Sequence, residues 1–329
     1  MHEIQGETQL RDDFRPNLND IREAHRRIAP HIHRTPVMTS ESLNEISGAK
    51  LFFKCENLQV TGSFKMRGAT NAVFSLTEEE AARGVVTPSS GNHGAALSRA
   101  ARSRGIPAWV IMPNNSPMVK RHAVEAYGGN ITLCEPTIRS RQETAAAVQA
   151  RTGAILIHPY DNDLIIAGQG TAAAELLEEV PELDLIIAPV SGGGLLSGTS
   201  IASKGIRPQI KVIGAEPKNA DDAFQSLKAG HIVTLDHYDT IADGLRATLA
   251  PRTFAILSRL VDEISTVTEA EIIAAMRLLW ERMKIVVEPS GAVSAAPALN
   301  RRIQAERKRV GIILSGGNVD LTSLPFSAA

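Results

Sequence analysis

Residues 184–203 read DLIIAPVSGGGLLSGTSIAS, an apolar run followed by three glycines and then by a helix-like stretch. From residue 50 onward the chain repeats this order of short apolar runs and longer helix-like stretches. The runs lack the alternation of half-exposed strands, so they are typical of strands buried on both faces of a parallel sheet. They occupy 51–56, 84–88, 107–113, 130–135, 154–158, 184–190, 210–216 and 310–315. The helix-like stretches lie at 93–104, 140–151, 171–180 and 268–283. This alternation predicts a doubly wound α/β fold.

The composition is that of an ordinary globular chain. Of its 329 residues, 43% are hydrophobic and 22% charged, which predicts two lobes with packed cores rather than disorder. Its 35 basic and 36 acidic side chains nearly cancel, so we expect no nucleic-acid or membrane partner. The N-terminal residues do not resemble a signal peptide, and Cys55 and Cys134 are too few for a disulfide framework. Both features predict a cytosolic protein.

A glycine loop follows the run at 184–190. Ser191, Gly192, Gly193 and Gly194 allow a ligand to approach the backbone closely, and the helix that follows offers unpaired N–H groups to an anion. This arrangement predicts a phosphate site. A tight turn alone is one alternative, and a dinucleotide site is another. Ser197 stands where the dinucleotide pattern has its third glycine, which weighs against that second alternative.

A lysine opens another predicted helix. In TGSFK, residues 61–65, Ser63 is a candidate N-cap and Lys65 lies at the helix start beside Phe64. The helix dipole and an apolar neighbour both disfavour the ammonium form. Lys65 is therefore a candidate for Schiff-base chemistry with an aldehyde cofactor. Taken alone, a solvated surface lysine is the alternative.

Two further polar loops follow predicted strands. Ser89, Ser90, Asn92 and His93 offer hydroxyl, amide and helix-start N–H groups to a small carboxylate, and Ser315 could present a hydroxyl to a ring nitrogen. Each loop alone could be a turn. In doubly wound folds, however, ligands bind beyond the carboxyl ends of the strands, where all four loops should meet.

Four motifs together resemble a known family. In chain order they are TGSFKMRGA at 61–69, SSGNHG at 89–94, SGGGLLSG at 191–198 and LSGGNVD at 314–320. The chain resembles the serine racemase and serine/threonine dehydratase group of fold-type II pyridoxal-phosphate enzymes, which includes a 3-hydroxyaspartate dehydratase branch. The resemblance spans about residues 17–321. It implies a fold like that of the tryptophan synthase β subunit, with two doubly wound domains and mostly parallel sheets. It also implies a homodimer.

The resemblance implies a domain division and a cofactor site. Residues 1–77 and 158–329 would form the large cofactor-binding domain, and residues 78–157 a small lid domain. Lys65 would hold pyridoxal 5'-phosphate covalently and act as a catalytic residue. The other cofactor contacts would be Phe64 against the ring, Asn92 on the ring oxygen, Ser191, Gly192, Gly193, Gly194 and Leu195 at the phosphate, Ser315 on the ring nitrogen, Gly244 and Glu288. Ser89, Ser90, Asn92 and His93 would bind the substrate α-carboxylate.

The resemblance also implies a metal site. In EPKNADD, the Glu216 and Asp222 carboxylates and the Ala220 carbonyl would bind Mg²⁺, Mn²⁺ or Ca²⁺. Oxygen ligands of this kind suit hard cations. An acidic helix cap is the alternative for the same residues.

The implied reaction is an elimination. The enzyme would remove water from a β-hydroxy amino acid to give an oxo acid and ammonia. Arg141 matches a family position near the second carboxylate of acidic ligands, so 3-hydroxyaspartate is favoured over serine and threonine; a solvated helix-surface arginine is the alternative. Ser90 could return a proton to the opposite face, which keeps a serine or aspartate racemase open. A silent amino-acid-binding regulator is disfavoured because Lys65 is present.

Overall fold

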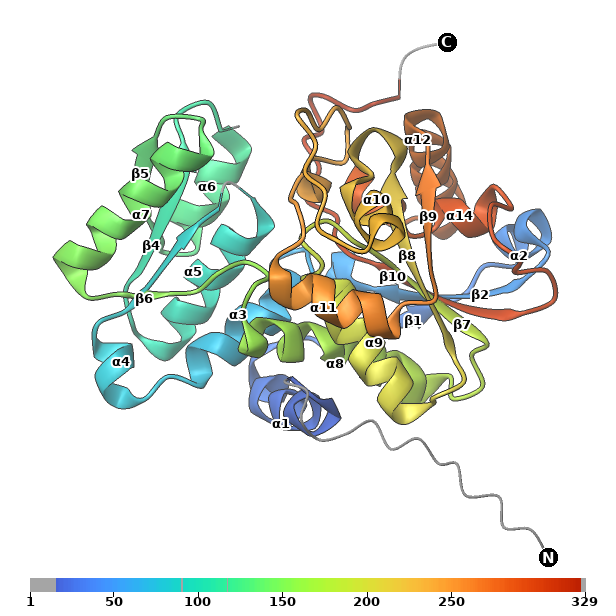
Figure 1. Ribbon diagram of the computed structural model, residues 1–329, viewed down its shortest axis with the longest axis horizontal. Helices are drawn as coiled ribbons and strands as arrows, with labels where there is room; N and C mark the ends of the chain where they lie inside the picture. The colour runs from blue at the N-terminus through green and yellow to red at the C-terminus, as the bar shows by residue number, and fades with distance from the viewer. Residues whose placement is uncertain (1–15, 90, 117, 327–329) are drawn as a thin grey trace, which may run out of the picture.

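The chain forms two sheets in two lobes. The computed structural model describes residues 16–89, 91–116 and 118–326 (Figure 1). One lobe holds a six-stranded sheet in the order β1-β2-β10-β7-β8-β9, and the other a four-stranded sheet in the order β5-β4-β3-β6. The strands of the first sheet are β1 (Val37–Met38), β2 (Lys50–Cys55), β7 (Leu185–Pro189), β8 (Lys211–Pro217), β9 (Glu263–Val267) and β10 (Arg309–Leu314). Those of the second are β3 (Val85–Pro88), β4 (Ala108–Pro113), β5 (Asn130–Cys134) and β6 (Ile155–Leu156).

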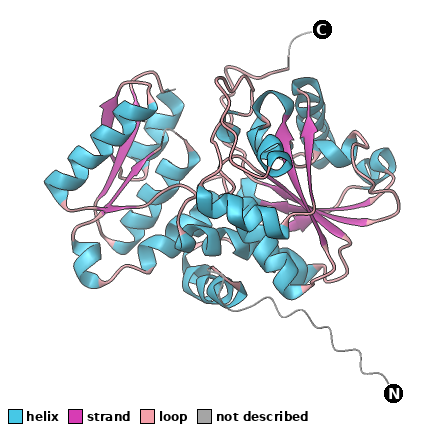
Figure 2. Cartoon of the chain, in the orientation of Figure 1, coloured by secondary structure: helices cyan, strands magenta, loops and turns pink. Residues whose placement is uncertain are grey.

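Helices cover both sheets (Figure 2). They are α1 (Leu18–Ile28), α2 (Glu41–Ser47), α3 (Lys65–Phe74), α4 (Glu78–Ala82), α5 (Asn92–Arg104), α6 (Met118–Ala126), α7 (Ile138–Thr152), α8 (Asp163–Glu179), α9 (Gly194–Ile206), α10 (Asp222–Ala229), α11 (Pro251–Leu260), α12 (Glu269–Leu278), α13 (Pro289–Ala292) and α14 (Ala296–Leu299). Short 3₁₀ turns lie at Ala29–His31, Glu56–Leu58, Lys218–Ala220 and Asp243–Leu245, and a π turn at Leu279–Met283. Helix α3 packs against α5 of one lobe and α8 of the other.

The sheets confirm the predicted fold class. Among the described strands, β1 is antiparallel to β2 and the other pairings are parallel. The six-stranded sheet is buried on both faces: Leu185 and Ile187 belong to one core cluster, and Ile186 and Ala188 to another. This explains why the run at 184–190 shows no alternation of apolar and polar residues.

The sequence missed two strands and the start of one helix. Strand β9 has the alternating sequence EISTV, without a continuous apolar run, and β1 has two residues. Helix α8 begins at Asp163, eight residues before the predicted stretch, and contains Gly168. Glycine lowers helix propensity, but here a Cβ on Gly168 would lie 2.6 Å from Gly68 Cα. Close packing of α8 on α3 therefore overrides the local preference.

Candidate active site

The loop that carries Lys65 is joined to the end of β10. The Phe64 N–H donates to the Ser315 carbonyl at 3.0 Å, and Ser63 pairs with Gly316 in an isolated antiparallel bridge. Two motifs that are far apart in the sequence thus lie side by side. The sequence predicted Ser63 as the N-cap of α3. In the structure the N-cap residue is Phe64, and no side chain makes a capping hydrogen bond. The cap prediction is wrong because Ser63 belongs to the bridge.

The Lys65 side chain is half-buried, and its amine has a lowered pKa. Its Nζ donates to the Pro159 carbonyl at 3.0 Å and lies 5.0 Å from the centroid of the Phe64 ring. Burial lowers the pKa of Lys65 from 10.5 to about 8. This environment differs from that of a solvated surface amine, and the pKa shift has the direction that the sequence predicts. Such an amine is poised to react with an aldehyde near neutral pH.

The glycine loop starts α9 and packs against Tyr160. Ser191 and Gly193 have positive φ values of 55° and 86°. A Cβ on Gly192 would lie 2.6 Å from atoms of the Tyr160 ring, and a Cβ on Gly194 would lie 2.9 Å from Tyr160 Cβ. Packing thus requires glycine at both positions, as the tight-turn alternative assumed. No side chain caps α9, so its N-terminal N–H groups also suit a phosphate.

Pro159 and Tyr160 connect this loop to the lysine. The amine binds the carbonyl of Pro159, and the next residue, Tyr160, covers Gly192 and Gly194. Lys65 and the glycine loop therefore lie on either side of one short segment. Sequence reasoning missed both residues, because neither belongs to a glycine-rich or charged motif.

Some polar groups of the loop after β3 already form hydrogen bonds within the protein. Ser89 Oγ accepts hydrogen bonds from the N–H groups of Gly94 at 3.1 Å and Gly91 at 3.4 Å. His93 is buried, with Nε2 3.3 Å from the Ile157 carbonyl, and its Nδ1 has no hydrogen-bond partner among the residues that the structure describes. Burial, reinforced by the Lys65 charge, lowers the pKa of His93 to about 3. The ring is therefore neutral. Ser90 lies outside the described residues.

Asn92 is held by two partners. Its Nδ2 donates to Glu288 Oε1 at 2.8 Å, and its Oδ1 accepts from Asn318 Nδ2 at 2.9 Å. Burial, followed by the neighbouring Asp243, raises the pKa of Glu288 from 4.5 to about 8. A carboxyl held largely protonated thus fixes the amide. Asn318 was missed, although it lies in the LSGGNVD motif.

Ser315 and Gly244 meet through Ser290. Ser315 Oγ donates to the Ser290 carbonyl at 3.4 Å, and the Gly244 N–H donates to Ser290 Oγ at 3.0 Å. Ser315 is buried. The residues predicted at the ring nitrogen and at the site wall are therefore neighbours, and Ser290 is a further residue that the sequence analysis missed.

Arg141 lies apart from these contacts. It is in the first turn of α7, in the lobe with the four-stranded sheet, and its N–H donates to the Thr137 carbonyl at 3.1 Å. The side chain is half-buried near the Cys134 thiol, and its Nε has no hydrogen-bond partner among the described residues.

The predicted cation ligands lie close together in the chain at the end of β8: Glu216 is in the strand, Ala220 is in the 3₁₀ turn that follows, and Asp222 begins α10. Glu216, Ala220 and Asp222 are buried. The Glu216 oxygens accept from the N–H groups of Ala223 at 3.3 Å and Phe224 at 2.9 Å, as expected for the helix-cap alternative. Both Asp222 oxygens, in contrast, have no hydrogen-bond partner among the described residues.

The electrostatics of this loop fit a bound cation. Burial, reinforced by Asp222, raises the pKa of Glu216 well above 4.5, and burial together with Asp221 raises that of Asp222 to about 7. The described residues contain no cluster of three His, Cys, Asp or Glu side chains around a common point. The donor set predicted from the sequence, two carboxylates and a carbonyl, would suit a hard cation.

The Lys65 amine and the uncapped N-terminus of α9 lie at the carboxyl ends of mostly parallel strands. This arrangement is that of the class of fold-type II pyridoxal-phosphate enzymes. The chain belongs to the family described as pyridoxal-phosphate dependent enzyme, whose model matches residues 28–316.

Relatives of the chain are named for both racemisation and dehydration. The chain is 54% identical to a serine racemase of Arabidopsis thaliana, with 95% of this chain and 96% of the relative covered. It is 52% identical to a beta-hydroxyaspartate dehydratase of Paracoccus denitrificans (strain Pd 1222), with 95% and 99% covered. It is also similar to the structure of maize serine racemase, with a TM-score of 0.91 at 50% identity over 93% of this chain and 94% of that one. The chain is therefore an enzyme of the racemase and dehydratase group. Within the part of the chain that is described, no helix is long and apolar enough to cross a membrane.

Proposed function

We propose that the protein is an ammonia-lyase that eliminates water from a β-hydroxy amino acid, with 3-hydroxyaspartate favoured and serine or threonine possible. The observation that carries the proposal is the Lys65 amine with its pKa of about 8. A 52% identical relative named for dehydration of beta-hydroxyaspartate supports the substrate class. The net reaction loses one water and then consumes one, giving an oxo acid and ammonia.

The residues present fit pyridoxal 5'-phosphate. Lys65 would hold its aldehyde, and residues 191–195 its phosphate. Ser315 would face its ring nitrogen, and Phe64, Asn92, Gly244 and Glu288 would make the remaining contacts. When bound, the cofactor withdraws electrons from the substrate and so acidifies its α-proton. A hydroxyl at the ring nitrogen suits elimination better than transamination.

The chain's own groups then move and hold protons. Lys65 Nζ, released from the cofactor, would accept the α-proton, because a base with a pKa near the working pH is the most effective. The free amine donates to the Pro159 carbonyl in the structure, and the same contact would orient it once it is released. Glu288 and Asn318 hold Asn92 in one orientation. The loop of Ser89, Ser90, Asn92 and His93 would bind the α-carboxylate. His93 would contribute through its main chain, because its neutral ring is buried.

Substrate charge would be selected by Arg141. We assign residues 78–157 as a lid domain that moves against residues 1–77 and 158–329 and carries Arg141 toward the substrate. A guanidinium binds a carboxylate through two parallel charge-assisted hydrogen bonds. Among the described residues Arg141 Nε has no hydrogen-bond partner, so a substrate carboxylate that reached it would supply one.

The alternative is a serine or aspartate racemase. It is supported by the 54% identical serine racemase, and Ser90 would be its second proton donor. We further propose that Glu216, the Ala220 carbonyl and Asp222 bind Mg²⁺, Mn²⁺ or Ca²⁺, and that the chain forms a homodimer.

One experiment tests the substrate and the reaction together. L-serine, D-serine, L-threonine and the 3-hydroxyaspartate isomers are each supplied to the enzyme, and both oxo-acid release and the chirality of the recovered substrate are measured. We expect a 3-hydroxyaspartate isomer to give the fastest oxo-acid release, and Lys65→Ala to lose more than about 10³-fold in activity. Inverted serine without oxo acid would establish the racemase instead. A preference for threonine would contradict the role of Arg141.

A further inference from the structure

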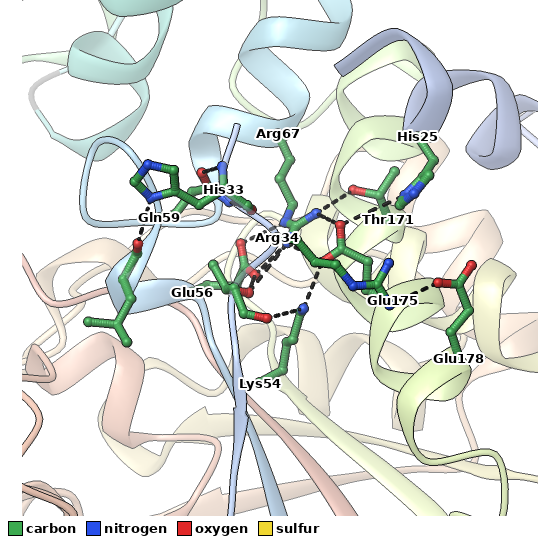
Figure 3. A network of polar contacts seen from close by, with 12 residues as sticks. His25, His33, Arg34, Lys54, Glu56, Gln59, Arg67, Thr171, Glu175 and Glu178 are labelled. Atoms are coloured by element: carbon green, nitrogen blue, oxygen red, sulfur yellow. Dashed lines mark hydrogen bonds and ion pairs between the residues drawn. The ribbon is translucent and has the colours of Figure 1, made fainter. Parts of the chain in front are cut away.

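A cluster of buried charges lies beside the first turn of α3 (Figure 3). Lys54, Glu56, Arg67 and Glu175 meet there with at most 2% of each side chain exposed. Nε and Nη2 of Arg67 donate to the two Glu56 oxygens at 2.7 and 2.8 Å, and Nη1 and Nη2 donate to the two Glu175 oxygens at 2.8 Å. Lys54 Nζ donates to Glu175 at 2.6 Å. Two positive and two negative charges thus balance one another.

The cluster joins three parts of the large lobe. Lys54 lies in β2, Glu56 begins the 3₁₀ turn after it, Arg67 lies on α3 and Glu175 on α8. Thr35 Oγ1 donates to Glu56 Oε1 at 2.6 Å, which adds a link from the segment before β1. Arg67 is therefore the point at which α3 is fixed to the sheet and to α8.

The start of α3 needs such an anchor. Lys65 is the first residue of this helix, and no side chain caps it. The Phe64 N–H to the Ser315 carbonyl holds the chain before the helix, but the first turn itself contains Arg67. Buried ion pairs add little net stability compared with apolar packing of the same volume, so stability alone does not account for four buried charges at this place.

We propose that Arg67 is a positioning residue for Lys65: its bonds to both carboxylates fix the first turn of α3, and so fix where the amine lies and how well it is shielded from water. The inference rests on the proposed role of Lys65 as cofactor anchor and base. Displacement of a reacting group by about 1 Å can cost on the order of 10²-fold in rate, so a rigid anchor two residues away matters for catalysis.

The anchor acts through position rather than through charge. The cluster is balanced, and burial is the cause of the lowered pKa of Lys65. If the first turn loosens, water reaches the amine, and its pKa rises toward 10.5. A variant that keeps the positive charge at residue 67 but cannot bind both carboxylates should therefore shift the pH profile of catalysis upward.

Arg67→Lys is that variant, because lysine keeps the charge and cannot bind two carboxylates in parallel. Thr35→Val is a milder second variant that removes the hydroxyl bond to Glu56. Arg34→Lys is the matched control, since Arg34 pairs with Glu178 on the exposed side of α8. For each holoenzyme we measure kcat, KM, the pH dependence of kcat, the visible absorbance of the bound cofactor and hydrogen exchange at residues 65–70.

We expect Arg67→Lys to lower kcat about 10- to 100-fold with little change in KM. The pH profile of kcat should move upward, because Lys65 is a free amine only after the substrate has released it, and amide exchange in the first turn of α3 should quicken. Thr35→Val should show the same changes to a smaller degree, and it decides the question if Arg67→Lys does not fold. Variants that lose only thermal stability, with kcat, pH profile and exchange unchanged, would overturn the inference. A parent protein without cofactor would refute the proposed function, whereas the exchange measurement tests the anchor in either case.

Discussion

Two pairs of buried carboxylates lie in the lobe with the six-stranded sheet, and they differ in every respect except burial. Glu56 and Glu175 are each bound by the Arg67 guanidinium. Although burial opposes it, the Arg67 hydrogen bonds and charge lower the pKa of Glu175 to about 2. Glu216 and Asp222 have no such cation, and the pKa of Asp222 is raised to about 7. We call Glu56 and Glu175 the complete pair, because Arg67 supplies their counter-charge. We call Glu216 and Asp222 the incomplete pair, because no described side chain does so for them.

The difference shows how the direction of a pKa shift separates a structural ion cluster from a ligand site. Burial alone acts in the same direction on both pairs, so the sign of the shift depends on whether the chain supplies the counter-charge. A completed pair belongs to the packing of the protein. A pair without a counter-charge either takes up protons or binds a cation, and a bound cation is what we propose for Glu216 and Asp222.

The largest effect is expected from breaking the complete pair. Glu56→Gln keeps the volume of the side chain but leaves Arg67 with one carboxylate, and we expect it to lower the free energy of unfolding by about 3–5 kcal/mol. Urea denaturation at neutral pH measures the loss. Glu178→Gln, in the exposed pair with Arg34, is the control and should cost at most about 1 kcal/mol. Equal losses in the two variants would contradict the contrast drawn here.

Acid should remove the contribution of the complete pair. The folded-state pKa of Glu175 is about 2 against an ordinary 4.5, so its stabilisation is complete above pH 4.5 and is lost as the pH falls toward 2. The contribution is about 3 kcal/mol, since one pKa unit corresponds to about 1.4 kcal/mol. Urea midpoints of the parent and of Glu175→Gln, compared from neutral pH downward, should converge across this window. A constant difference throughout would show that the carboxylate charge is not what stabilises the fold.

A divalent cation should complete the second pair. At a concentration of 100 times its Kd, a cation that binds only the folded state stabilises it by about 2.7 kcal/mol. We therefore expect Mg²⁺, Mn²⁺ or Ca²⁺ to raise the Tm of the chelator-treated protein, and Glu216→Gln with Asp222→Asn to abolish the rise. Asp221→Asn, which changes the adjacent carboxylate, is the control and should keep most of it. A parent Tm that does not respond to any of these cations would refute the site.

The sequence predicted the complete pair poorly and the incomplete pair well. Glu216, Ala220 and Asp222 are close in the chain, so a local motif could reveal them. Lys54 and Glu175 are 121 residues apart and meet only because β2, α3 and α8 pack together. No local sequence pattern predicts that contact, and nothing in the motif TGSFKMRGA indicates the partners of Arg67.

The same limit applies to the fold and the active site. The parallel sheets, the glycine loop and the low-pKa lysine were predictable, because each follows from a short run of residues. The contacts of Pro159, Tyr160, Ser290 and Asn318 were not, because they depend on tertiary packing. The homodimer and the cytosolic location stay predictions.

The smallest expected effect is that of Asp222→Asn on the free energy of unfolding. It gives the sharpest comparison, because its sign should be opposite to that of Glu56→Gln. Asp222→Asn and Glu56→Gln each replace a buried carboxylate by an amide of similar size. Glu56→Gln removes a counter-charge that the fold uses. Asp222→Asn removes a charge that repels Glu216 and has no cation or full hydrogen bond among the described residues, although the backbone N–H of Leu249 favours it. In chelator, we therefore expect Asp222→Asn to leave the free energy of unfolding unchanged or to raise it, by about 1 kcal/mol at most, since the new amide also lacks a partner. Urea denaturation in chelator at neutral pH measures it. With a saturating cation the order should reverse, because the parent then gains binding energy that the variant has lost. If Asp222→Asn in chelator is destabilised as strongly as Glu56→Gln, the two pairs are alike, and the second needs no cation to be stable.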